Sequence, residues 1–154
     1  MQTEQKIKEL GLELPKVSAP IANFVNSRLA GGFLYLSGQG PKDAAGVLHQ
    51  GKLGQDLTVE QGYEHAKYVG LNLLAVAKEA LGDLDRIEAV VKLLGMVNAT
   101  PDFTDHPKVV NGCSDLMVEV FGKERGSHAR SAVGMSSLPG NISVEIEVIF
   151  KVKD

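Results

Sequence analysis

The sequence predicts an α+β domain in which two long helices cover one face of a mixed β-sheet. Three features lead to this prediction. Strand-like segments lie towards both ends of the chain, another lies between two long segments of helical periodicity, and crossovers of the usual right hand place both helices on the same face. The chain has 154 residues, of which 44% are hydrophobic and 23% charged. This length and composition suit one domain over residues 1–154.

At the amino terminus we expect a short helix over residues 3–10 and then an extended arm, so that residues 1–19 form a helix-and-arm unit. Thr3 is the predicted N-cap, because a threonine hydroxyl can accept a hydrogen bond from a free N–H of the first turn. Gly11 follows the last turn, where a positive φ is favourable for glycine.

Two strands are predicted next, at residues 23–28 and 33–39. Residues 30–32 contain two glycines and suit the turn of a hairpin. Residues 40–54 contain a proline and four glycines, so we expect a loop there, with a short strand at residues 47–49.

The first long helix begins at a capping box. Thr58 can accept a hydrogen bond from the Gln61 backbone N–H while the Gln61 side chain reaches back to the amide of residue 58. Gly82 follows the last turn as the C-cap. The apolar face at helical spacing consists of Tyr63, Ala66, Gly70, Leu73, Leu74, Ala77 and Leu81.

A strand at residues 87–97 connects this helix to the second one, which we expect to begin near Asp105 and to end at Gly122. Residues 129–135 and 142–152 are the last two strands. They follow each other closely in the chain, and we expect them to pair as a hairpin.

Both faces of the strand at residues 87–97 are apolar, which predicts an oligomer. One face carries Ile87, Ala89, Val91, Leu93 and Val97, and the opposite face carries Val90, Leu94 and Met96. Two helices can cover only one face of a sheet. The other face is therefore expected to pack against further copies of the chain.

Arg130 and Glu145 form the candidate functional pair. Alternation along the strand places His128 and Ala132 on the same face as Arg130. If the last two strands are neighbours, Arg130 and Glu145 can face each other across them. One interpretation is a structural cross-strand ion pair. The other is an arginine fork for a ligand carboxylate, with an adjacent acid that handles a water molecule.

Four short segments occur in a characteristic order: FLYLSGQ at residues 33–39, RSAV at residues 130–133, LP at residues 138–139 and VEIE at residues 144–147. In this order they resemble the landmarks of the Rid (reactive intermediate deaminase) family, historically labelled endoribonuclease L-PSP. The amino-terminal helix and residues 103–112 resemble a longer subgroup of that family.

The resemblance implies a chorismate-mutase-like fold that assembles as a trimer, with a central barrel of sheets and ligand clefts between subunits. It also implies hydrolysis of reactive 2-enamines or 2-imines to 2-keto acids and ammonia, a reaction that needs no metal or cofactor. By position, Arg130 would hold the substrate carboxylate and Glu145 would position water or move a proton. Ser37, Gly38 and Asn111 would line or support the same cleft.

Three positions depart from the usual pattern of the family. Phe24 stands where many members carry a tyrosine, so a hydroxyl that could contact the ligand is missing. Ala132 stands where others have a cysteine, which removes a thiol from the expected cleft. His128 takes a place often held by proline. It can either supply a second donor to the ligand or serve as a plain surface or interface histidine.

Other functions stay open. A non-catalytic protein could use the same cleft to bind or sense a small carboxylate, and Phe24 and Ala132 favour that alternative. A net charge of −3 with scattered Lys and Arg argues against tight binding to nucleic acid, although it does not exclude occasional cleavage of a flexible RNA. An endoribonuclease is the less favoured alternative, because only His128 stands beside Arg130 where a histidine or lysine pair is expected. The single cysteine, Cys113, and the spacing of the histidines do not suit a metal site. A polar amino terminus and the lack of a long apolar run predict a cytoplasmic protein.

Overall fold

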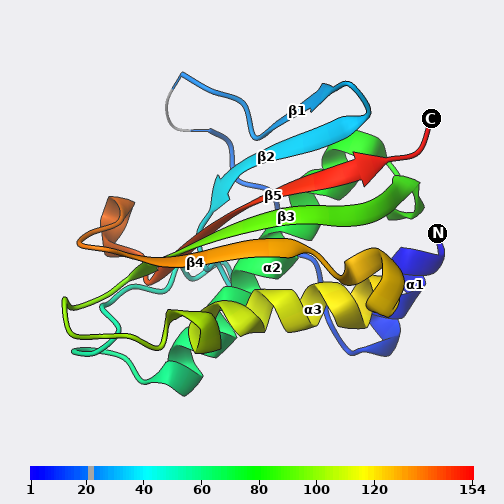
Figure 1. The fold of residues 1–154 in the computed structure, drawn as a ribbon. Helices are drawn as coiled ribbons and strands as arrows, with labels where there is room; N and C mark the ends of the chain where they lie inside the picture. Colours follow the sequence, from blue (N-terminus) through cyan, green and yellow to red (C-terminus); the bar gives the residue numbers. More distant parts are fainter. Residues whose placement is uncertain (21–22) are drawn as a thin grey trace.

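The computed structural model describes residues 1–20 and 23–154, and the predicted α+β fold is confirmed (Figure 1). In chain order the elements are α1 (Gln2–Glu9), β1 (Ser27–Ala30), β2 (Phe33–Gln39), α2 (Val59–Leu81), the 3-10 helix η1 (Leu84–Arg86), β3 (Ile87–Asn98), α3 (His106–Gly126), β4 (Ala129–Met135), the 3-10 helix η2 (Pro139–Asn141) and β5 (Val144–Val152). The two long helices lie side by side on one face of the sheet (Figure 1).

The sheet has the strand order β1-β2-β5-β3-β4, in which β3 and β4 are parallel and all other neighbours are antiparallel. The predicted hairpin between the last two strands is therefore wrong, because β5 inserts between β2 and β3 and leaves β4 at the edge. Burial explains the order. Every second residue of β5 is fully buried, whereas none of β4 is, so β5 gains more from the centre.

The two helices pack closely because small residues line their contact. A Cβ at Gly112 of α3 would overlap the carbonyl of Tyr63 in α2, and a Cβ at Gly70 would lie 2.7 Å from a Leu116 methyl group. Only glycine permits this approach of the two backbones. No helix in the described part of the chain is both long enough and apolar enough to cross a membrane.

Two irregularities in β3 change which residues face the helices. Register shifts occur between Ile87 and Ala89 and between Val90 and Lys92. Each inserts one residue and so interrupts the two-residue alternation. As a result Val90 is buried on the helix side, while Ala89 and Val91, which strict alternation assigned to that side, are only half buried.

The amino-terminal helix is capped by a distant carboxylate and not by Thr3. Its first turn begins at Gln2, so Thr3 lies inside the helix. The Asp85 carboxylate of η1 accepts hydrogen bonds from the Gln2 and Thr3 amides, both at 2.7 Å, and from the Thr3 hydroxyl at 2.6 Å. Gly11 has a φ of 73°, as its position after the helix predicts.

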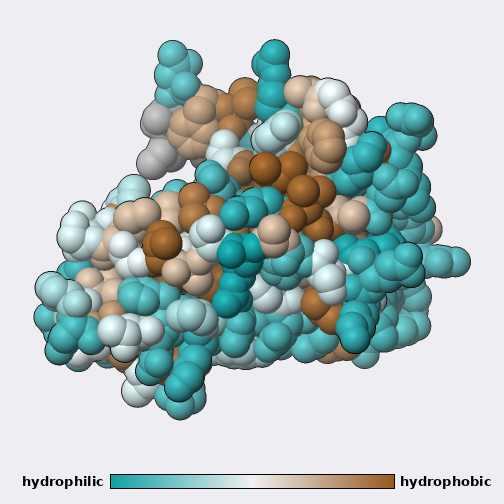
Figure 2. Space-filling model, viewed as in Figure 1, coloured by the Kyte–Doolittle hydropathy of each residue, from teal (hydrophilic) through white to brown (hydrophobic). Residues whose placement is uncertain are grey.

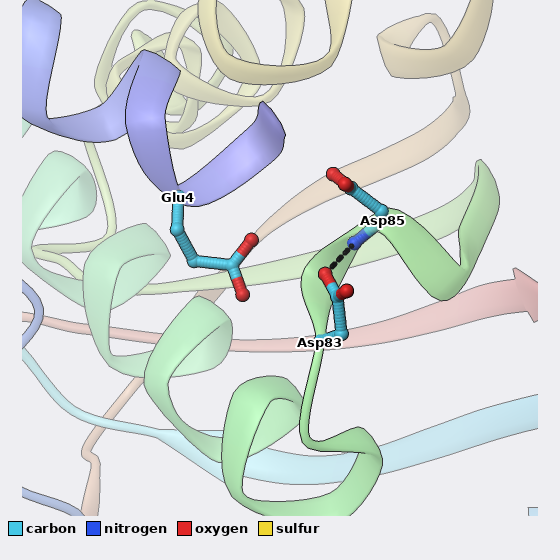
Figure 3. Close-up of side chains that lie close together, drawn as sticks. All are labelled: Glu4, Asp83 and Asp85. Carbon is cyan, nitrogen blue, oxygen red and sulfur yellow. Dashed lines mark hydrogen bonds between the residues drawn. The ribbon is translucent and has the colours of Figure 1, made fainter. Parts of the chain in front are cut away.

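Three carboxylates meet where α1 joins the rest of the protein. Figure 3 shows Glu4 reaching from α1 towards the segment that carries Asp83 and Asp85, with the hydrogen bond from the Asp85 amide to Asp83 dashed. Lys78 pairs with Glu4 at 2.8 Å, and the terminal ammonium of Met1 pairs with Asp85 at 2.8 Å. These two cations offset two of the three acidic charges, and their contacts fasten α1 to the end of α2 and to η1.

The other predicted bounds differ from the structure at loops and ends. The first strand is Ser27–Ala30 instead of residues 23–28, and residues 47–49 contribute only an isolated bridge, from Leu48 to Lys42. The second long helix continues to Gly126, with non-helical φ and ψ at Gly122, where the sequence predicts its end. The capping box at Thr58 is confirmed.

His65 is a buried polar residue in the helix layer. Its Nδ1 lies 2.8 Å from the Ser143 hydroxyl, and its ring stacks on that of His49 with a centroid distance of 4.6 Å. Burial, and secondarily the nearby His49, lowers the pKa of His65 to about 4. The imidazole is therefore uncharged in the folded protein at neutral pH.

Acidification should destabilise the fold through His65. Between pH 6.5 and pH 4 the unfolded state binds a proton that the folded state excludes, so the free energy of unfolding should fall by about 1–3 kcal/mol as pH decreases through this window. Urea unfolding of the parent and of His65→Gln at pH 4.5 and pH 7 measures the difference. His106→Gln is the control and should keep the parent's pH dependence. An unchanged pH dependence in His65→Gln would contradict the assignment.

Candidate functional site

Arg130 lies on β4 with its side chain against α3. One of its terminal nitrogens, Nη1, donates to the Asn111 side-chain oxygen at 2.8 Å and to the Ser114 hydroxyl at 3.1 Å. The guanidinium is half buried at the outer edge of the sheet. Asn111 was predicted to support this site, and the structure places it in direct contact with Arg130.

His128 joins the same group through Ser114. Its Nε2 lies 2.9 Å from the Ser114 hydroxyl, and its Nδ1 lies 2.7 Å from the carbonyl oxygen of Gly126. Both ring nitrogens are thus engaged within the protomer. We call Arg130, Asn111, Ser114 and His128 the arginine half-site. Ser114 was missed by sequence reasoning, although its position three residues after Asn111 places it on the same helix face.

The interpretation of Arg130 and Glu145 as a cross-strand ion pair is wrong. Glu145 lies on β5, and β3 separates β5 from β4. The two side chains also lie on opposite faces of the sheet, since Arg130 contacts α3 while Ile146, the neighbour of Glu145, is buried on the helix side. Within the described residues Arg130 forms no ion pair. The acceptors that the structure gives for its guanidinium, Asn111 and Ser114, are both neutral.

Glu145 is half buried on the open face of the sheet. Burial raises the pKa of its carboxyl, and the charge of Glu147 raises it further. Gly38 of β2 lies opposite, where a Cβ would overlap the carboxylate and lie 2.9 Å from the Glu145 Cδ atom. Only glycine at position 38 leaves room for the carboxyl group of Glu145 where it now lies.

Ser37 connects the same region to the segment that holds Phe24. Its hydroxyl donates to the carbonyl of Val25 at 2.6 Å, and its amide donates to the carbonyl of Asn26 at 2.9 Å. Phe24 is 47% exposed beside them. We call Glu145, Gly38 and Ser37 the glutamate half-site.

The structure therefore divides the predicted site residues into two groups. Ala132 lies on β4 two residues after Arg130 and packs against the core, so it belongs beside the arginine half-site. The glutamate half-site lies on the opposite face of the sheet. A small ligand within one protomer cannot contact both.

The open face of the sheet is apolar and hollowed. Figure 2 shows brown, hydrophobic surface over the middle of this face, interrupted by hydrophilic side chains. A cavity of about 390 Å³ lies there. It is lined by Tyr35, Leu36, Lys92, Leu94, Ser131, Glu147, Val148 and Ile149. Tyr35, which lies on this face, is 45% exposed, as the predicted uncovered face requires.

The fold is of the chorismate-mutase-like type, and comparisons of sequence identify the family. Residues 4–150 match the family described as "YjgF/chorismate mutase-like, putative endoribonuclease". A Trypanosoma cruzi protein named TCP17 is 42% identical over 148 residues, which cover 96% of this chain and 92% of that protein. A Lactococcus lactis protein named "putative regulator AldR" is 31% identical over 135 residues, which cover 88% of this chain and 91% of that protein. The chain belongs to the YjgF/chorismate mutase-like family, that of the Rid or L-PSP proteins.

Solved structures agree with this assignment. A protein of unknown function from Agrobacterium tumefaciens has a TM-score of 0.90 and 41% identity, over 99% of this chain and 93% of that one. A "putative endoribonuclease" from Shewanella oneidensis has a TM-score of 0.93 and 36% identity, over 97% of this chain and 99% of its own. Escherichia coli TdcF, solved with bound serine, shares the fold at a TM-score of 0.65 and 20% identity, over 92% and 97% of the two chains.

Gly38→Ala should move the Glu145 carboxyl towards solvent and lower its pKa towards the ordinary value for glutamate, because the added methyl would occupy the carboxyl's present place. The free energy of unfolding should change by less than about 1 kcal/mol, since the end of a flexible side chain can shift. A carboxyl-detected NMR titration measures the pKa in parent and variant.

Gly40→Ala is the matched control for this experiment. The atoms nearest to its Cβ would belong to Ile142 and Leu48, each at 3.2 Å, and not to Glu145, so the titration of Glu145 should stay as in the parent. If Gly38→Ala also left that titration unchanged, the two residues would not be in contact.

Proposed function

We propose that the protein hydrolyses reactive 2-imino or 2-enamine acids to 2-keto acids and ammonia. The observation that carries this proposal is the state of Arg130, a half-buried guanidinium oriented by neutral acceptors and without a carboxylate partner among the described residues. Such a group offers a fixed positive charge to a small acidic ligand. Membership of the Rid family supports the choice of substrate class.

The active assembly is a homotrimer in which the arginine half-site of one protomer faces the glutamate half-site of the next. Two features support this arrangement. The half-sites lie on opposite faces of one sheet, so a single protomer cannot bring them to one small ligand. The apolar open face and the edge strand β4 are also surfaces that a second copy can cover.

The reaction begins with the carboxylate of the substrate held by Arg130. This contact fixes the C=N carbon and converts a bimolecular hydration into an oriented one. Glu145 on the neighbouring protomer takes a proton from the attacking water. Its raised pKa suits this role, because a carboxyl that titrates closer to neutrality can both accept and return a proton.

The bonds and protons balance without a further reactant. Water forms a C–O bond at the protonated imine carbon, and Glu145 transfers one of the water's two protons to nitrogen, while the other stays on the new hydroxyl group. The C–N bond then breaks, which leaves the C=O group of the 2-keto acid and releases ammonia that takes up the remaining proton. A protonated imine is already electrophilic, so the chemistry requires no metal.

A protein that binds a small carboxylate without turnover is the second candidate. The relative named as a regulator favours it, as do the absence of a hydroxyl at Phe24 and of a thiol at Ala132. Endoribonuclease activity, which the name of one similar structure states for that protein, is a third outcome. RNA cleavage that survives both repurification and Arg130→Ala would support it.

Arg130→Ala should lower kcat/KM for 2-iminopropanoate by about 100-fold or more, because the substrate carboxylate loses its charged anchor. The measurement is release of pyruvate from imine generated in the assay. Arg86→Ala, an exposed arginine near α1, is the control and should behave as the parent. Equal rates in the parent and Arg130→Ala would refute the proposal. Thermal stabilisation by pyruvate without turnover in the parent would favour the binding protein.

Subunit mixing tests whether each cleft is shared between protomers. Arg130→Ala and Glu145→Gln should each be inactive alone. Random trimers refolded from an equal mixture should recover roughly a quarter of the parent activity, because roughly one cleft in four combines an intact Arg130 with an intact Glu145. Each variant refolded alone is the control. No recovery in mixtures that form trimers would place both groups in one protomer.

A further inference from the structure

We propose that Ser114 and His128 are positioning residues that determine which edge of the Arg130 guanidinium meets the substrate. This inference rests on the proposed function, since it concerns the same carboxylate-binding site. It differs from the expectation that His128 donates directly to the ligand. Both nitrogens of that ring are already engaged, by Ser114 and by the Gly126 carbonyl.

The hydrogens of the Arg130 guanidinium that are already used within the protomer show which of its edges is free for a ligand. Nη1 of Arg130 carries two hydrogens, and Asn111 and Ser114 accept one each, at 2.8 and 3.1 Å. A carboxylate that binds end-on needs one hydrogen from each terminal nitrogen, so that approach is closed. In the described residues Nε and Nη2 have no acceptor. The substrate carboxylate is therefore held side-on, by these two nitrogens.

His128 fixes the direction of the Ser114 hydroxyl. A carbonyl oxygen can only accept, so Nδ1 of His128 donates its hydrogen to Gly126. In the neutral imidazole Nε2 is then an acceptor, and the Ser114 hydroxyl donates to it at 2.9 Å. The Ser114 oxygen therefore offers a lone pair to Arg130 and accepts the hydrogen bond from its Nη1.

The carbonyl that sets this polarity is itself held firmly. Gly126 is buried at the end of α3, and a Cβ there would lie 2.6 Å from the carbonyl oxygen of Met117 and 2.8 Å from the Cα atom of Val118. This close backbone packing fixes the acceptor of His128. The hydrogen-bond chain therefore runs in one direction, from Arg130 through Ser114 and His128 to a rigid carbonyl.

The test compares His128→Phe, Ser114→Ala and the double variant on 2-iminopropanoate. Each single variant should lower kcat/KM about tenfold, mainly by raising KM, because the loss of one hydrogen bond loosens a carboxylate anchor used in binding. The double variant should be no worse than either single one, because both act through the same hydroxyl. His128→Gln, which keeps an acceptor near the position of Nε2, should recover most of the activity.

Ser127→Ala is the control, since among the described residues its hydroxyl donates to the Lys123 carbonyl at the helix end and not to the arginine half-site. Circular dichroism and urea unfolding confirm that each variant is folded. Additive losses in the double variant, or kcat/KM within about twofold of the parent in both folded single variants, would overturn the inference.

Calorimetry with pyruvate on the same variants separates this inference from the proposed function. If the parent binds pyruvate without hydrolysing imine, the deaminase activity is refuted. A non-additive loss of pyruvate affinity in the variants would then still support the positioning role of Ser114 and His128. If the parent neither binds pyruvate nor turns over imine, both the proposed function and the positioning role are refuted. If the parent is active and all the variants match it, only the positioning role is refuted.

Discussion

The arrangement of the site depends on how the protein accommodates the charge of one guanidinium. Arg130 is half buried, yet in the described part of the chain its guanidinium donates hydrogen bonds to an amide oxygen and a hydroxyl, both from α3. A carboxylate partner would have cancelled the charge and removed any reason to bind an acid. Neutral acceptors orient the Arg130 side chain without neutralising its charge. The rest of the guanidinium is partly removed from water and, among the residues that the structure describes, lacks a negatively charged partner. In the proposed function, an acidic ligand supplies the missing partner for this charge.

The strand order places the acid away from this charge. β3 separates the strand of Glu145 from the strand of Arg130, and alternation along β5 puts Glu145 on the open face of the sheet, while Arg130 at the edge strand points to the helices. Gly38 then gives the Glu145 carboxyl its space from a third strand. In the proposed mechanism one small molecule contacts both groups, which requires a junction between two protomers, so that mechanism ties catalysis to assembly.

Local signals in the sequence were sufficient for much of the fold. The capping box at Thr58 formed as expected, because all of its atoms lie within four residues. Thr3 failed as a cap because a better acceptor, Asp85, comes from a segment 82 residues away in the chain. The pairing of the last strands failed for the same reason, since burial along the whole sheet decides it. Family resemblance drew attention to Arg130, whereas the contact of Ser114 with Arg130 depends on how α3 packs against β4 and could not be predicted from the sequence.

The position of β5 has a consequence for biosynthesis. The strand at the centre of the sheet lies after all the others in the chain, so β2 and β3 lack their shared antiparallel partner until residues 144–152 have been made. During translation their hydrogen-bonding edges stay open to other nascent chains, a condition that favours aggregation. Loss of these few residues would divide the sheet in two instead of fraying its margin.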